Sequence, residues 1–123
     1  DGEASGIAFG DPVRPIDVLF LHATGFNAIT YESILEPLGS RMHAAAVDMR
    51  GHGRSRLPAN PRRMKSWNKF RDDVIQLLDK TAPEGAVLGG HSMGATVALQ
   101  YDPVPGAYRG CVPLKQIGRA WAT

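Results

Sequence analysis

Hydrophobic positions along the chain fall into short apolar runs separated by stretches with a helical period. The runs at 16–21 (IDVLFL), 44–49 (AAAVDM) and 86–90 (AVLGG) have the length of buried strands. Between them, apolar residues recur three and four positions apart, as on one face of an amphipathic helix. Strands that alternate with helices are typical of an α/β domain. We therefore expect a mostly parallel sheet flanked by helices.

Start and stop signals delimit two of these helices. The first is expected to begin at Thr30, which can cap it, and to end at Pro37 and Gly39. The second is expected to be capped by Ser66 and closed by Pro83. Its apolar stripe consists of residues at helical spacing: Trp67, Phe70, Val74, Leu77 and Leu78.

The last 23 residues, 101–123, differ in character from the rest of the chain. They contain three prolines, three glycines and no clear period. We expect irregular structure there, with one or two helical turns at 114–122 (LKQIGRAWA). The length of 123 residues suits one domain, 1–123, of which this tail is the atypical part.

The segment GGHSMGATVAL contains the pattern Gly-x-Ser-x-Gly, centred on Ser92. This serine follows the predicted strand at 86–90 and opens a predicted helix at 93–100, which is the context of a nucleophile elbow. So sharp a turn crowds the positions two before and two after the serine, and Gly90 and Gly94 relieve the crowding. The helix N-terminus then directs free N–H groups at an oxyanion on a bound carbonyl.

Two other interpretations of this segment compete with a nucleophile. It could be a glycine-rich strand-to-helix turn without chemistry. It also differs by one residue from a phosphate-binding P-loop, but Ala95 stands where that loop needs a lysine to reach the phosphates. The strand–serine–helix context favours the nucleophile over both.

The stretches FLHATGFN, VDMRGHGRS and GGHSMGATVAL, in this order, make residues 13–100 resemble the α/β-hydrolase fold superfamily of serine esterase type. The resemblance implies a partial α/β-hydrolase fold that lacks the C-terminal strands and the cap. It also implies that Ser92 cleaves an ester or related acyl bond through an acyl-enzyme, with the Met93 N–H as one oxyanion donor. For the second donor, Thr24 is the first candidate and Phe26 the second. No cofactor is implied.

A serine nucleophile needs an adjacent base, which a third group orients. The resemblance implies that an acid and then a histidine follow the serine in the chain. Here Asp102 is the one acid after Ser92, and all four histidines precede it: His22, His43, His52 and His91.

None of the four histidines is an obvious substitute for the missing base. By the resemblance, His22 orders the oxyanion loop, and His52 is expected to stabilise its own glycine-rich loop. His43 is expected at the surface. The His91 side chain adjoins Ser92 in sequence and is expected to point elsewhere.

The sequence departs from the family pattern near Tyr101. The strand at 86–90 is therefore expected at the edge of the sheet, where an exposed edge favours self-association with another chain. One interpretation is the N-terminal portion of an active hydrolase. The alternative is a catalytically incomplete fragment or interaction module that lacks the triad Asp and His. A third is a complementing half whose partner chain supplies both residues.

The composition excludes several functional classes for this chain. A net charge of +2 is too small for a nucleic-acid binder, and no apolar run approaches the roughly 20 residues of a membrane span. Cys111 is the one cysteine, so an internal disulfide is excluded, and no metal-ligand spacing is present. The N-terminal DGEASG lacks the features of a signal peptide, so a cytoplasmic location is expected. The expected partner is a small-molecule, ester-like substrate.

Overall fold

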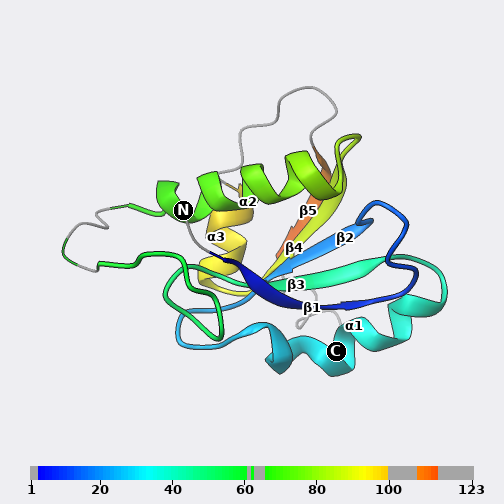
Figure 1. Cartoon of the computed structure of the whole chain (residues 1–123), viewed down its shortest axis with the longest axis horizontal. Coiled ribbons are helices and arrows are strands. Elements are labelled where there is room, and N and C mark those ends of the chain that lie inside the picture. The colour runs from blue at the N-terminus through cyan, green and yellow to red at the C-terminus, as the bar shows by residue number, and fades with distance from the viewer. Residues whose placement is uncertain (1–2, 61, 63–65, 100–107, 114–123) are drawn as a thin grey trace.

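The computed structural model describes residues 3–60, 62, 66–99 and 108–113, the last of these as backbone only. They form a five-stranded sheet in the order β1-β3-β2-β4-β5, with helices on both faces (Figure 1). The strands are β1 (Ser5–Phe9), β2 (Val18–Leu21), β3 (Ala44–Asp48), β4 (Ala86–Gly90) and β5 (Tyr108–Pro113). The helical segments are the 3-10 helices η1 (Ala28–Tyr31) and η2 (Glu36–Ser40) and the α-helices α1 (Glu32–Leu35), α2 (Asn68–Thr81) and α3 (Met93–Leu99).

The sheet is mostly parallel, as the alternation of apolar runs and helical stretches predicts. β2 pairs in parallel with β3 and with β4, and β4 pairs in parallel with β5, whereas β1 is antiparallel to β3. At the carboxyl ends of the two central strands, Leu21 of β2 is the register partner of Gly90 of β4. The loops that follow these strands therefore leave the sheet side by side.

Two apolar clusters cover the two faces of the sheet. Successive side chains of a strand point to opposite faces, so Leu19 and Leu21 pack against α2 and α3, whereas Phe20 packs against η1 and α1. In Figure 1, α2 and α3 lie on one side of the strands and α1 on the other. The predicted α/β class is confirmed.

The segment after β2 is not the single helix expected from Thr30. It consists of three short segments, η1, α1 and η2, and its cap is Asn27, whose side chain accepts the Thr30 N–H at 3.3 Å. Pro37 lies at the start of η2 rather than after the helix, because proline fits the first helical turn, where its missing N–H has no acceptor.

Helix α2 follows its sequence signals more closely, although it begins at Asn68 with Trp67, rather than the predicted Ser66, at the N-cap position. The Ser66 hydroxyl accepts the Asn68 N–H at 3.3 Å, and the helix ends two residues before Pro83. Of the predicted stripe, Phe70, Val74 and Leu78 are buried, Leu77 is half-buried and Trp67 is 39% exposed just before the helix begins. In the described part of the chain, no helix is long and apolar enough to cross a membrane.

Two strands differ from the sequence prediction. β1 was not predicted, because its alternation SGIAF leaves only Ile7 and Phe9 to pack, and both are half-buried. β5 lies in the tail that was expected to be irregular. Glycines and prolines there favour turns, so the sequence gives no strand signal, and the strand is paired in parallel with β4. β4 is therefore not the edge strand that was predicted, whereas self-association with another chain stays a prediction. The helical turns expected at 114–122 lie outside the described residues.

Candidate functional site

Ser92 lies between β4 and α3 in a conformation that non-glycine residues rarely adopt. Its φ is +54°, and within the described residues it is the one non-glycine position with positive φ. Its side chain is exposed, whereas Met93 and Gly90 beside it are buried. Left-handed backbone at a non-glycine residue persists only where the surrounding structure enforces it. The turn therefore presents a single hydroxyl at the carboxyl edge of the sheet.

The two glycines of the motif are required by close backbone contacts. A Cβ on Gly90 would overlap the backbone of Gly94 and Ala95, so the first turn of α3 packs directly on the end of β4. A Cβ on Gly94 would overlap the carbonyl of Leu21 in β2. The predicted crowding is present, and at Gly94 the neighbouring strand causes it rather than the motif itself.

The start of α3 provides a backbone donor next to Ser92. The Gly94 N–H donates to the His91 carbonyl at 3.0 Å, and the Thr96 N–H donates to the Ser92 carbonyl at 3.0 Å. Met93 is the first residue of the helix, where amides have no intrahelical acceptor. Its N–H is therefore in a position to donate to an anionic oxygen held beside Ser92.

The loop after β2 forms a tight turn facing the same edge of the sheet. The Phe26 N–H donates to the Ala23 carbonyl at 3.0 Å, and Gly25 at φ +79° supplies the left-handed corner. Thr24 is the exposed first corner of this turn, and the Phe26 side chain is 44% exposed. Of the two candidate donors, the Phe26 amide is thus already bonded within the loop.

His22 anchors this loop and is held neutral. Its Nε2 accepts the Met49 N–H at 2.9 Å, so its proton is on Nδ1, which donates to the Ala23 carbonyl at 2.7 Å. Burial lowers the pKa of His22. The hydrogen bond to Ala23 opposes this shift, and the His52 ring, with its centroid 4.8 Å away, adds to it. Both ring nitrogens are occupied, so His22 is a structural residue, as the resemblance implies, and cannot take a proton from Ser92.

The other upstream histidines also have partners of their own. His43 is buried, not at the surface as predicted, because the 14–17 loop folds over it. Its ring Nδ1 lies 2.7 Å from the Arg14 carbonyl, and its backbone N–H donates to the Asp17 carboxylate at 2.8 Å. His52 Nδ1 lies 3.0 Å from the Arg50 carbonyl, within the glycine-rich loop that it was expected to stabilise. Among the described residues, no three His, Cys, Asp or Glu side chains are grouped to hold a metal ion.

A hydrogen-bonded connection between Tyr31 and His91 was not predicted from the sequence. The Tyr31 hydroxyl accepts the Ala23 N–H at 3.1 Å and lies 2.8 Å from Nδ1 of His91. Burial raises the pKa of Tyr31, with the Ala23 bond opposing, so the phenol keeps its proton. The helical pattern placed Tyr31 only on an apolar face. The available signal was that a buried tyrosine needs a partner for its hydroxyl.

Asp48 organises the glycine-rich loop after β3. Its carboxylate is buried and accepts the Ala28 N–H at 2.7 Å and the Arg54 N–H at 3.1 Å. A Cβ on Gly53 would overlap this carboxylate. The loop therefore has a structural role.

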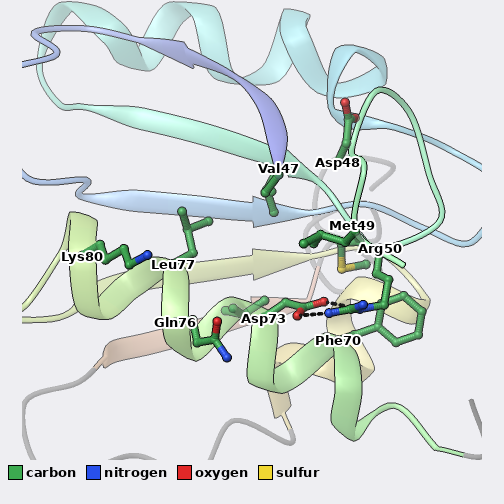
Figure 2. A pocket seen from close by; sticks show the side chains of 12 residues that line it. Val47, Asp48, Met49, Arg50, Phe70, Asp73, Gln76, Leu77 and Lys80 are labelled. Atoms are coloured by element: carbon green, nitrogen blue, oxygen red, sulfur yellow. Dashed lines mark hydrogen bonds and ion pairs between the residues drawn. The ribbon is translucent and has the colours of Figure 1, made fainter. Parts of the chain in front are cut away.

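A separate pocket lies between α2 and the end of β3 (Figure 2). An ion pair between Arg50 and Asp73 closes one side of it, with Nη2–Oδ1 at 2.7 Å and Nε–Oδ2 at 2.9 Å. The hydrogen bond to Asp73 raises the pKa of Arg50. The apolar lining includes Val47, Met49, Phe70, Val74 and Leu77. Ser92 does not line this pocket, so it is not the space beside the elbow serine.

Comparisons with known proteins identify the relatives of this chain. The chain is 35% identical over 88 residues to the 2-(acetamidomethylene)succinate hydrolase of Mesorhizobium japonicum, a match that covers 68% of this chain and 31% of that protein. It is 38% identical over 82 residues to an epoxide hydrolase of Caballeronia sordidicola, covering 66% of this chain and 25% of that protein. The chain thus spans a third or less of the length of these curated relatives.

A solved structure extends the agreement in fold. The thioesterase domain from the curacin biosynthetic pathway superposes with a TM-score of 0.75 at 20% identity, covering 99% of this chain and 53% of that one. The family described as "Alpha/beta hydrolase family" matches residues 18–119, which is most of the sequence. The chain therefore belongs to the alpha/beta hydrolase family.

Proposed function

We propose that this chain carries the nucleophile of a serine hydrolase that cleaves an ester or related acyl bond through an acyl-enzyme on Ser92. The observation that carries the proposal is the exposed Ser92 at φ +54° in the turn between β4 and α3. This geometry supports attack because the hydroxyl stands clear of the sheet while the backbone around it is fixed by Gly90 and Gly94.

In the proposed reaction, the Ser92 oxygen attacks the carbonyl carbon of the substrate and loses its proton to a base. The carbonyl oxygen becomes an oxyanion, which the Met93 and Thr24 N–H groups would hold. We assign Thr24 rather than Phe26, because the Phe26 amide is bonded to Ala23 within its turn. The alcohol then leaves with a proton, and water releases the acyl group in a second step.

Residues 100–123 contain no histidine, so the base would be a histidine that these 123 residues do not contain, such as one supplied with its acid by a second chain. The partners of His22, His43, His52 and His91 support this, because each ring is bonded to a group other than Ser92. The same observation favours a second candidate function, a non-catalytic fragment or interaction module that keeps the hydrolase half-fold without turnover.

For the substrate, we propose a small molecule with an ester-like bond. The relatives are named for an acetamidomethylene succinate and an epoxide, so membership in the family does not fix the bond that this chain would cleave. No metal or cofactor is needed for the acyl transfer written above, which uses only a nucleophile, a base and backbone donors.

Acyl-enzyme trapping tests the proposal against its alternative. Without a base, deacylation is slow, so incubation with p-nitrophenyl acetate is expected to leave one acetyl group on Ser92, located by peptide mass spectrometry. Ser92→Ala removes the adduct, and Ser33→Ala, which alters an exposed serine on α1, keeps it. Acetyl groups spread equally over several serines would exclude the proposed nucleophile and leave the non-catalytic module.

A further inference from the structure

The geometry points to Tyr31 as a positioning residue for the oxyanion hole, whose hydroxyl ties the loop after β2 to the elbow by bridging the Ala23 amide and the His91 ring. This inference rests on the proposed function of Ser92 and extends it. The two residues that Tyr31 contacts are the immediate neighbours of two functional positions. Ala23 precedes Thr24, and His91 precedes Ser92.

The two partners of the hydroxyl assign the direction of the bridge. The Tyr31 oxygen accepts the Ala23 N–H at 3.1 Å, and His91 Nδ1 at 2.8 Å is the other group that it contacts, so we assign its one hydrogen to a bond donated to Nδ1. Tyr31 is only 3% exposed, so water cannot take over either bond. Since Nδ1 accepts, the proton of the neutral His91 ring is on Nε2.

Ring contacts hold the bridge at both ends. The Tyr31 ring lies 4.5 Å from the Phe20 ring at the end of β2, and 6.0 Å from the His91 ring, edge to face at 80°. Phe26 meets the His91 ring edge to face at 5.7 Å. The hydroxyl therefore has little freedom to turn, and a shift of the loop relative to the elbow must break one of its two bonds.

Besides the contact between the Phe26 and His91 rings, the tip of the loop is open. Thr24 is exposed there, and Gly25 beside it has left-handed backbone with no heavy atom within 4 Å of where a Cβ would lie. The Tyr31 bridge joins this loop to a residue 60 positions later in the chain. With the bridge intact, the Thr24 and Met93 amides keep the spacing that an oxyanion requires. Without it, the loop retains its turn but loses its alignment with the elbow.

The test measures labelling of Ser92 by a p-nitrophenyl alkylphosphonate, with the limiting rate (kinact) separated from the half-saturating concentration (KI). Tyr31→Phe removes the hydroxyl and keeps the ring. We expect kinact to fall at least about fivefold, because the bonds to Ala23 and to His91 are both lost, with KI unchanged. A purely structural role would lower the thermal midpoint without this split between kinact and KI.

Two substitutions at His91 keep the inference testable if Tyr31→Phe folds poorly. His91→Asn offers an amide oxygen where Nδ1 accepts, and is expected to keep most of the rate, whereas His91→Leu is expected to lose it. The double variant Tyr31→Phe/His91→Leu should be no slower than Tyr31→Phe alone, because that variant already lacks the bond that His91→Leu removes. The ¹⁵N spectrum of the wild-type chain should show His91 protonated on Nε2.

The outcomes separate this inference from the proposed function. If the wild-type chain is labelled at Ser92 and the Tyr31→Phe and His91→Leu variants react at its rate, Tyr31 is a core residue only and the inference is wrong. If the wild-type chain itself is not labelled above the level of the Ser92→Ala chain, the proposed function fails, and the positioning role fails with it.

Discussion

At the scale of single residues, the site depends on backbone positions that have no room to change. Ser92 holds φ +54°, a conformation that costs on the order of 1–3 kcal/mol for a non-glycine residue. The turn cannot relax, because Gly90 packs against the first turn of α3 and Gly94 packs against the Leu21 carbonyl. That carbonyl also accepts the His91 N–H at 3.0 Å, so the same atom fixes the elbow to β2 from two directions.

Gly94→Ala is expected to destabilise the fold, because its Cβ would overlap the Leu21 carbonyl and push α3 away from β2. Urea denaturation should show the free energy of unfolding lower by about 3 kcal/mol. Gly25→Ala is the matched control. It has left-handed backbone but no atom within 4 Å of its Cβ, so only backbone strain of about 1 kcal/mol is expected. Equal losses in the two variants would contradict the role given to Gly94.

His22 is expected to make the fold sensitive to mild acid. Burial lowers the pKa of His22 below the 6.5 of the unfolded chain, so the unfolded state binds more protons in the interval between the two values. The contribution of His22 to the free energy of unfolding is complete above pH 6.5 and declines as the pH falls from 6.5 toward the pKa of the folded state. Denaturation at about pH 7.5 and about pH 5.5 should show a smaller pH-dependent loss in His22→Gln than in the wild-type chain. An equal loss would show that His22 does not contribute.

At the scale of elements, α2 shows which face of a helix stabilises the sheet. Phe70 is 7% exposed in the cluster that joins α2 and α3 to the sheet, whereas the adjoining Trp67 is 39% exposed. Their rings lie 5.6 Å apart, so the two aromatic side chains share a region of the molecule but differ in burial. Burial, and not aromatic character, should decide their contributions.

This difference predicts unequal truncation costs. Phe70→Ala is expected to lower the free energy of unfolding by about 3–5 kcal/mol, the usual effect of emptying an aromatic core position. Trp67→Ala is expected to cost roughly 1 kcal/mol, since much of its surface already contacts water. Chemical denaturation of both variants measures the two values. A larger loss for Trp67→Ala would contradict the burial pattern.

Helices and strands with a long apolar run or stripe were predictable from the sequence. Short elements, and strands that depend on pairing with a distant strand, were not. β2, β3 and β4 are continuous apolar runs, and α2 has a stripe with a stop signal, so the sequence predicts them nearly to their ends. The segment from η1 to η2 is helical in composition, but Asn27 starts it three residues early and Pro37 falls inside it. β5 depends on pairing with β4, a contact that no local pattern in 108–113 contains.

At the scale of the whole molecule, the parallel order of β2 and β4 assembles the site. Their carboxyl ends pair at Leu21 and Gly90, so the loop that contains Thr24 and the turn that contains Ser92 share one edge of the sheet. The motif predicts the serine because its glycines are local to it. The Tyr31–His91 connection could not be predicted, because it joins residues 60 positions apart through a fold-dependent contact.

Labelling of the purified chain with a fluorophosphonate, read by intact mass and peptide mapping, measures most directly whether this fold holds Ser92 as a nucleophile. Backbone donors preserve part of the rate when a triad member is absent, so slow labelling confined to Ser92 is expected. The adduct should be present in Ser33→Ala and absent from Ser92→Ala and from heat-denatured chain. Labelling at the same rate in folded and denatured chain, or spread over other serines, would show that the fold does not make Ser92 a nucleophile.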